Sequence, residues 1–435
     1  MADELRRPGH LALATWGLFA GLALLMLGGG VFSTLLGVRS EQVGLPTLVS
    51  SAISASYYVG FIVGTRLTLR GLRSVGHIRV YGALASILAA AMVATGITGI
   101  ALAWGLLRLV VGLTTAGLYV VAESWLNELA DNTNRARLLS VYAALTVAFW
   151  GVGQILVFAF EAQDATGYSV AAILTCLAVA PVALSEEAVA PGPGVAGRMT
   201  LRQLVEQAPT GVGAYLLVGV THGAMNGMVA IYATRIGMTP GEVGVFAAIP
   251  ALGGMLLQYP VSSASDDLDR RAVGVAAATL AAGVSLLLAL GPQTGWTAFA
   301  LMGLLGGFTY PLWVIAAAYA NDWIDPRHVS AAASQLVTLY GVGAVVGPFV
   351  AAGAMVVIGT EGFFWSLVAL HVVVATFFVY RMFASRAPLT KRPWSEVSLP
   401  ARTLLLPVML ISVTRRRGGD EIDARPDEQH DSATP

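Results

Sequence analysis

Twelve stretches of about 20 mainly apolar residues follow one another along this chain, and a stretch of that length suits a helix that crosses a bilayer. Of all residues, 56% are hydrophobic and only 11% are charged. A soluble globular protein carries about 25% charged residues, so the composition excludes that class. The pattern therefore predicts an all-α membrane protein with twelve transmembrane helices.

The apolar stretches fall into two groups of six. The first group is expected at residues 11–36, 46–69, 78–98, 101–128, 137–160 and 168–184, and the second at 211–233, 240–262, 272–290, 296–321, 328–356 and 361–382. Pro and Gly crowd the segment between the groups, and such a composition breaks helices. We therefore expect an N-terminal half (1–184), a cytoplasmic linker (185–209) and a C-terminal half (210–384).

A further segment, residues 385–435, follows the last apolar stretch. Its own apolar run, Leu399–Thr414, is short and contains Pro400 and Pro407, so we expect it to lie at the cytoplasmic surface rather than to cross the membrane. The residues after Arg417 are polar and acidic, a composition typical of disorder. The segment is therefore expected to be a partly disordered cytoplasmic tail.

The distribution of Arg and Lys predicts the orientation, because these residues gather in cytoplasmic loops. An even number of helices puts both termini on one side. When that side is taken as the cytoplasm, all of the 25 basic residues fall there except Arg39, Arg235 and Arg108. Arg39 and Arg235 then lie outside, and Arg108 lies within the membrane. We expect a multi-pass protein of the cytoplasmic (inner) membrane with both termini in the cytoplasm.

The two groups of helices also repeat one another in sequence. A shift of 194 residues lays Pro46 on Pro240, and a shift of 190 residues lays Gly153 on Gly343. Ordered matches at a nearly constant offset indicate an internal duplication. Two six-helix repeats are typical of secondary transporters, which bind their solute near the midplane where the repeats meet.

One charged residue lies deep inside a predicted membrane helix. Arg108 shares a helical face with Thr115, Tyr119 and Glu123, since these positions fall within about 80° of one another at about 100° per residue. A charge in hydrocarbon is costly and normally faces protein or a wet cavity. Arg108 is therefore a candidate ligand for a polar or anionic group, the alternative being a structural arginine satisfied by helix carbonyls.

The loop Gly64–Arg79 resembles motif A of the major facilitator superfamily, a large family of membrane transporters. Gly76 and Arg79 fit the motif, whereas Arg73 stands at its acidic position. The resemblance implies that this loop helps to latch the cytoplasmic side of the protein.

The second half carries a related loop, Ser263–Arg271, which keeps the acidic and basic residues but has Asp269 in place of the glycine. The residues that fit motif A in this loop are Asp266, Arg270 and Arg271.

In the first half, Arg108 and Gly112 resemble motif B of the superfamily, a motif that is often associated with proton coupling.

Four further strings are similar to the YcaD-like branch of the superfamily. They are VVAES, RARLLSVYAAL, GFTYP and GVGAVVGP. The last of these lies in the eleventh expected helix, whereas drug antiporters carry a similar string in the fifth, which disfavours a drug antiporter. The resemblance covers about residues 10–385. It implies a fold of two pseudo-symmetric six-helix halves around a central site bounded by helices 1, 4, 7 and 10.

Polar and aromatic residues of the expected membrane helices form one set of candidates, for substrate binding and translocation. His222 and Asn226 stand one turn apart in the seventh helix. A buried histidine can equally be a satisfied core residue, and an aromatic ring can equally be core packing. The candidates are Arg108, Tyr119, Gln154, His222, Asn226, Tyr310 and Trp313.

A second set of candidates is expected to gate the cytoplasmic side. Glu123 lies near the inner end of the fourth helix and is expected to pair with Arg73 or Arg137, with direct proton carriage as the alternative. The gating candidates are Arg73, Gly76, Arg79, Glu123, Arg137, Asp266, Arg270 and Arg271.

Motifs of other function classes are missing from the sequence. It contains no Walker-type phosphate loop, no HExxH and no Gly-x-Ser-x-Gly. The lone Cys176 excludes a cysteine-based metal cluster. We therefore expect no enzyme, no catalytic residues, no metal, no cofactor and no nucleic-acid partner. The expected partners are a small-molecule substrate and membrane lipids, and the chain is expected to be a monomer.

The predicted function is a secondary active transporter that moves a small molecule by rocker-switch alternating access. Proton coupling stays open, because no carboxylate lies near the predicted midplane and His222 and Glu123 are the candidates for carrying a proton. Two alternatives also stay open. One is an uncoupled facilitator, and the other is a membrane sensor or scaffold that keeps the fold without moving solute.

Overall fold

The computed structural model describes residues 8–129, 135–185, 199–291, 293–325 and 328–384. These residues form helices joined by turns and short connections, and twelve helical spans are long and apolar enough to cross a membrane. The predicted all-α membrane fold is therefore confirmed. The linker residues 186–198 and the tail, residues 385–435, lie outside the described residues.

In the first half the helices are α1 (Pro8–Gln42), α2 (Thr47–Val75), α3 (His77–Ile97), α4 (Ala101–Leu129), α5 (Arg135–Ile155), η2 (Leu156–Ala159), α6 (Ala165–Leu177) and α7 (Val179–Ala183). In the second half they are α9 (Pro209–Arg235), α10 (Pro240–Asp267), α11 (Arg270–Leu290), α12 (Trp296–Asn321), α13 (Val329–Ile358) and α14 (Gly362–Ala384). The spans lie close to their predicted positions, although α1 continues well past its predicted end, to Gln42.

A short helix, α8 (Leu201–Gln207), lies in the linker, where the Pro- and Gly-rich composition predicts none. Thr200 begins it with a capping box. Its hydroxyl accepts from the Gln203 backbone N–H, and the Gln203 side chain accepts from the Thr200 backbone N–H at 2.9 Å. These reciprocal bonds satisfy amides that the first turn of a helix otherwise leaves without partners.

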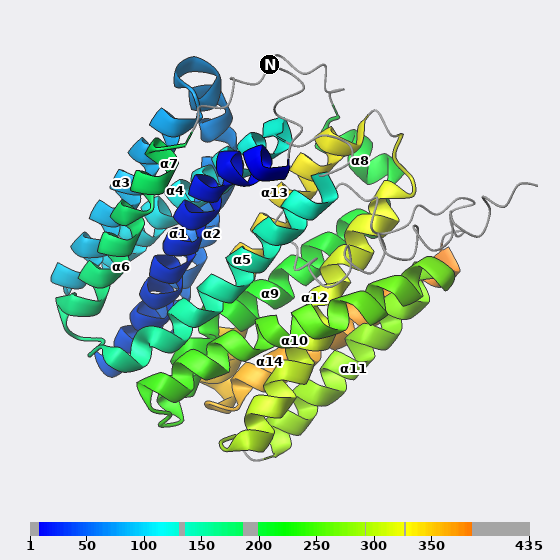
Figure 1. Cartoon of the computed structure of the whole chain (residues 1–435). Coiled ribbons are helices and arrows are strands. Elements are labelled where there is room, and N and C mark those ends of the chain that lie inside the picture. The colour runs from blue at the N-terminus through cyan, green and yellow to red at the C-terminus, as the bar shows by residue number, and fades with distance from the viewer. Residues whose placement is uncertain (1–7, 130–134, 186–198, 292, 326–327, 385–435) are drawn as a thin grey trace, which may run out of the picture.

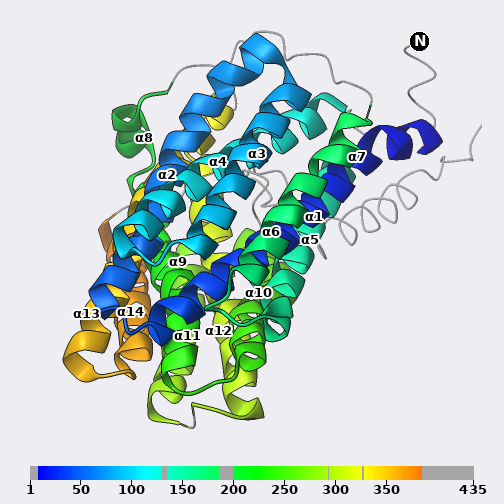
Figure 2. The ribbon, with the colours of Figure 1, turned by 90° about the vertical axis from the view of Figure 1, so that its left-hand side faces the viewer.

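The two halves lie side by side, the first half on the left and the second on the right of Figure 1. They meet along two seams, one where α5 packs against α10 and one where α2 packs against α13. Figure 2 shows α2 and α13 on one side of the molecule and α5 and α10 on the other. Helices α1 and α9 also contact each other across the halves.

Each half contains the same close crossing of two helices. In the first half a Cβ added at Gly112 of α4 would overlap the backbone carbonyl of Tyr57 on α2. In the second half a Cβ added at Gly306 of α12 would overlap the carbonyl of Pro250 on α10. Gly306 is Gly112 shifted by 194 residues, so the predicted repeat is present in the packing. Glycine allows this approach because it has no side chain.

The two halves differ in the turn that follows their second membrane helix. Gly76, between α2 and α3, has φ of 86°, a conformation that favours glycine. At the matching position of the second half, Asp269 has φ of −60° and caps α11 by accepting the Arg271 backbone N–H at 2.9 Å. The departure from motif A is therefore a helix cap in place of a glycine turn.

We predict that Gly112→Ala destabilises the protein by about 1–3 kcal/mol, because the added methyl group forces α2 and α4 apart. The measurement is thermal unfolding of the purified protein in detergent. Gly283→Ala on α11 is the matched control, since nothing lies within 4 Å of a Cβ there. Equal melting temperatures for the two variants would contradict the close crossing.

Candidate functional site

At one end of the bundle an ion pair joins the two halves. We call this end, which carries the α1–α2 turn, the outer end, following the orientation predicted from the basic residues. Arg235 donates from Nε and Nη2 to the two carboxylate oxygens of Glu41, each at 2.7 Å. Its Nη2 also donates to Thr47 Oγ1 at 3.1 Å. Two parallel charge-assisted bonds on side chains only 23% and 19% exposed make a well-ordered contact.

The two partners occupy equivalent positions in the repeat, because Arg235 is Glu41 shifted by 194 residues. A two-fold rotation carries each position to the opposite side of its axis. Two equivalent positions can therefore touch only where they lie next to that axis. The Glu41–Arg235 pair thus marks the pseudo-two-fold axis at the outer end of the protein.

Arg108 lies inside the first half and faces protein rather than lipid. Its Nη2 donates to Ser33 Oγ of α1 at 2.9 Å, and its guanidinium carbon lies 4.9 Å and 5.4 Å from the ring centres of Tyr57 and Phe32. Aromatic faces attract cations, so these rings help to hold the charge. The cavity beside it measures about 10 Å³, room for about one water. Among the described residues, its contacts are therefore one hydroxyl and the faces of two aromatic rings.

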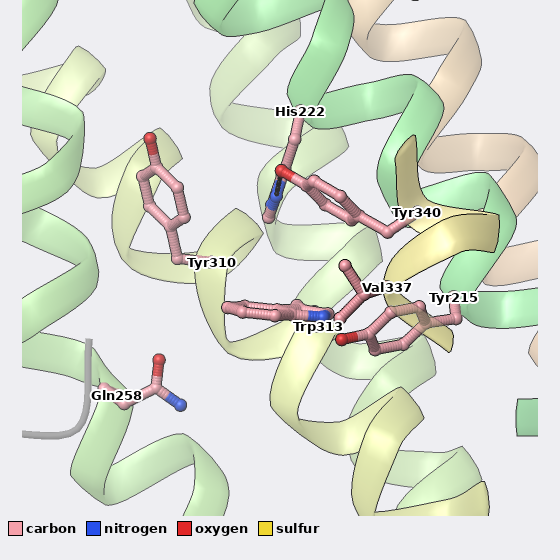
Figure 3. A pocket seen from close by; sticks show the side chains of 7 residues that line it. All are labelled: Tyr215, His222, Gln258, Tyr310, Trp313, Val337 and Tyr340. Carbon is pink, nitrogen blue, oxygen red and sulfur yellow. Dashed lines mark hydrogen bonds between the residues drawn. The ribbon is translucent and has the colours of Figure 1, made fainter. Parts of the chain in front are cut away.

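A larger cavity, of about 120 Å³, lies in the second half. Helices α9, α10, α12 and α13 supply its walls, as Figure 3 shows. The lining residues are Tyr215, His222, Gln258, Tyr310, Trp313, Val337 and Tyr340. Most of this wall is aromatic, and none of these side chains is a carboxylate, a lysine or an arginine.

His222 connects this cavity to a buried chain of hydrogen bonds. Its Nε2 lies 3.4 Å from the carbonyl oxygen of Thr309, which can only accept, so Nε2 carries a hydrogen and Nδ1 accepts from Tyr340 Oη at 3.2 Å. Thr309 Oγ1 in turn donates to His371 Nε2 at 2.9 Å, and His371 Nδ1 donates to the Leu367 carbonyl at 2.7 Å. Each histidine fits a single neutral tautomer.

At the inner end of the second half a fully buried arginine binds two carboxylates. Arg270 Nε donates to Asp322 Oδ2 at 2.8 Å, and its Nη1 donates to Asp266 Oδ1 at 2.9 Å. The side chains of Arg270 and Asp322 are both inaccessible to solvent. Arg271 pairs with Asp269 and also donates to the Arg381 carbonyl at the end of α14. This cluster joins α10, α11, α12 and α14 within one half.

Comparisons with known proteins agree with this architecture. A profile of the Major Facilitator Superfamily matches residues 211–418. An uncharacterized MFS-type transporter, YcaD of Salmonella arizonae, is 29% identical over 340 residues, which are 76% of this chain and 86% of the relative. YcaD of Salmonella newport is 28% identical over 344 residues, 78% of this chain and 88% of the relative.

Solved structures share the fold at low sequence identity. The nucleoside transporter NupG superimposes with a TM-score of 0.69 at 12% identity, covering 86% of this chain and all of that chain. A bacterial homologue of the human lysosomal transporter Spinster, in an inward-facing and unoccupied conformation, gives a TM-score of 0.70 at 13% identity, covering 86% of this chain and 97% of that chain.

In sequence and in fold, the chain is similar to the major facilitator superfamily. The resemblance to the YcaD-like branch is confirmed by the curated relatives, and the fold of two six-helix halves is that of the superfamily. These matches and the twelve candidate spans support a multi-pass membrane transporter.

The structure brings some of the candidate substrate residues together and separates others. His222, Tyr310 and Trp313 line the same cavity, and Tyr310 Oη donates to Asn226 Oδ1 at 3.0 Å. Tyr119 instead donates to Met26 Sδ at 3.2 Å in the first half. The backbone of Gln154 packs against glycines of α1 and α10, near the outer end of the α5 seam.

The gating candidates of the first half are only partly described. Gly76 forms the α2–α3 turn, and the Arg79 side chain is exposed. Glu123 accepts a hydrogen bond from Tyr142 Oη at 3.4 Å. The side chains of Arg73 and Arg137 lie outside the described residues, so the predicted pairing of Glu123 with them stays a prediction.

Several residues of the site are absent from the candidates chosen on sequence. Tyr215 and His371 lie on strongly apolar helices, where one ring or one histidine gives no signal of its own. Glu41 and Arg235 did carry a signal, because opposite charges stand at equivalent positions of the repeat. Arg235 was also one of the few basic residues on the predicted outer side.

We predict that Asp322→Ala destabilises the protein by about 3–5 kcal/mol, because it removes a partner from a buried guanidinium. The measurement is thermal unfolding in detergent. The control is Asp267→Ala, which changes an exposed residue at the inner end of α10. It is expected to change stability by no more than about 0.5 kcal/mol. Similar losses in the two variants would rule out the buried cluster as a stabilising element.

Proposed function

We propose that this protein is a secondary active transporter that moves a small molecule across the cytoplasmic membrane by rocker-switch alternating access. The observation that carries the proposal is the closed outer end, where the Glu41–Arg235 pair joins two repeated halves on their pseudo-two-fold axis. A pair at that place resists separation of the halves on one side of the membrane.

Other contacts between the halves continue this closure inward. Ser54 Oγ of α2 donates to the Gly227 carbonyl of α9 at 2.8 Å. Nearer the middle, Gly341 of α13 packs against the side chain of Ile62 on α2. These contacts support an outward-closed state. In a pseudo-symmetric bundle, rocking the halves about the central site produces the opposite state, and that motion must break the outer contacts.

We predict that Glu41→Gln and Arg235→Gln each open the outer end. Loss of a partly buried bidentate pair costs about 1–2 kcal/mol, which shifts a two-state equilibrium about five- to thirtyfold. The readout is labelling of Ser54→Cys from outside with a membrane-impermeant maleimide, in a Cys176→Ser background because Cys176 is exposed. Labelling is expected to accelerate by that factor.

The control for this experiment is Arg202→Gln, which breaks an exposed pair with Glu206 within α8 and is expected to leave labelling unchanged. The charge-swapped double variant Glu41→Arg with Arg235→Glu is expected to restore slow labelling. Unchanged labelling in the single variants would show that the Glu41–Arg235 pair does not keep the outer end closed. Labelling that succeeds only from the cytoplasmic side would reverse the proposed orientation.

Within this function, the solute binds between the halves. The first half contributes Arg108, Tyr119 and Gln154, with Arg108 as the ligand for a polar or anionic group. The second half contributes His222, Asn226, Tyr310 and Trp313. We further propose that the inner-end residues of both motif A loops latch the cytoplasmic side, and that the protein acts as a monomer among lipids, with no cofactor.

We propose His222 as the residue that binds the proton in a proton-coupled transport cycle. A proton at Nδ1 removes the acceptor that the Tyr340 hydroxyl uses, so that hydroxyl must turn, and Tyr340 lines the larger cavity. Protonation of the histidine and the shape of the solute site are thereby linked.

We predict that His222→Asn abolishes solute accumulation driven by an imposed pH gradient while keeping solute exchange at equal pH. The measurement uses proteoliposomes and a solute identified by a thermal-shift screen. His328→Asn, at the start of α13, is the control and is expected to keep both activities. Wild-type exchange without gradient-driven accumulation would identify an uncoupled facilitator. Binding without any flux would identify a sensor or scaffold.

A further inference from the structure

The wall of the larger cavity is a continuous chain of ring contacts. The ring centre of Trp313 lies 5.7 Å from that of Tyr340 and 5.9 Å from that of Tyr215. The ring centre of His222 lies 5.7 Å from that of Tyr340 and 4.9 Å from that of Tyr310. Such a surface offers flat, polarisable faces and ring edges to a ligand, which favours stacked or edge-on contact with another ring.

The polar atoms that remain available in this wall are few and uncharged. Gln258 Nε2 donates to Ser262 Oγ at 2.7 Å, and the amide of Gln258 points toward the aromatic wall from α10 in Figure 3. Trp313 Nε1 is buried and has no hydrogen-bond partner in the described part of the chain. A turn of the indole toward a ligand acceptor therefore breaks no existing hydrogen bond.

The charge around the cavity also narrows the class of ligand. No carboxylate lines the cavity, so a cation bound there has no counter-ion. Across the interface, the charged residue that lines the smaller cavity of the first half is Arg108. The charge carried by the residues that line the two cavities is therefore positive, which opposes a cation and favours a neutral or anionic ligand.

The volume of the cavity sets the size of the group it takes. An apolar protein cavity of about 150 Å³ accommodates benzene. At about 120 Å³ this cavity is somewhat smaller, so one small ring system fits only when the lining side chains move outward.

We propose that this cavity binds a flat aromatic or heteroaromatic ring without positive charge, and that the ring is part of the transported solute. The proposal rests on the proposed transport function and names its substrate class. The ring stacks on Trp313 and Tyr340, its edge bonds to Gln258, and any acidic substituent extends toward Arg108.

The test compares probes that share one ring and differ in charge. Indole is neutral, indole-3-acetate is an anion and tryptamine is a cation, while cyclohexylacetate has the acid without an aromatic ring. Binding to the purified full chain is measured by thermal shift and by calorimetry. Indole and indole-3-acetate are expected to bind at least about tenfold more tightly than tryptamine and cyclohexylacetate.

Variants locate the binding of the probes. Trp313→Ala and Gln258→Leu are each expected to weaken indole-3-acetate binding about tenfold, and Trp313→Phe, which keeps a ring, is expected to weaken it less. Trp296→Ala, at the outer start of α12 and 80% exposed, is the matched control with unchanged binding. A single symmetrical gel-filtration peak shows that each variant is folded.

Three results would overturn the proposal. They are tighter binding of tryptamine than of indole-3-acetate, equal binding of cyclohexylacetate and indole-3-acetate, and unchanged binding in the folded Trp313→Ala and Gln258→Leu variants. The maleimide experiment on Ser54→Cys uses no ligand and reports on alternating access alone. If the ring probes do not bind but labelling of Ser54→Cys responds to loss of the Glu41–Arg235 pair as expected, this inference is wrong and the proposed transport function is unaffected.

Discussion

The cost of burying a charge without a partner is the constraint on which the interior of this protein depends. Arg39 donates to the carbonyls of Thr95 and Gly96 at the end of α3 and lies against two aromatic rings. Arg108 uses a hydroxyl and two ring faces, and Arg270 uses two carboxylates. Each of these arginines binds helices of its own half together. They hold the helices of each half together, whereas Glu41–Arg235 ties one half to the other.

The fold follows from the sequence because the membrane makes the relevant signals local. A span needs about 20 apolar residues, so hydropathy alone places the twelve membrane spans. The internal offset of 194 residues then predicts two equivalent halves, and the repeated crossing at Gly112 and Gly306 has the physical form that the offset implies. Helix α8 is the exception. Its signal is the Thr200–Gln203 capping box, which is as local as hydropathy but is masked by the Pro- and Gly-rich residues before it.

The site is less predictable, because its geometry depends on which helices meet. Helix assignment by resemblance selects Tyr310 and Trp313 but cannot show that the ring of Tyr215 joins them. Spacing within a helix also misleads. His222 and Asn226 stand one turn apart, yet Asn226 bonds to Tyr310 of α12 and His222 bonds to Tyr340 of α13. Only the relative position of helices far apart in sequence decides such pairs, and no local pattern carries that information.

Helix α9 contributes residues to the aromatic cavity, to the contact with α2 and to the ion pair at the outer end. Tyr215 and His222 face the aromatic cavity, and Asn226 accepts a hydrogen bond from Tyr310. Gly227 accepts the hydrogen bond from α2, and Arg235 pairs with Glu41 at the outer end. Tyr215 and Arg235 are separated by about 30 Å along a helix with a rise of about 1.5 Å per residue. A helix packed on its neighbours transmits displacement of one end to the other. A rotation of α9 that reshapes the cavity therefore also strains the Glu41–Arg235 pair, because the same rigid element carries both.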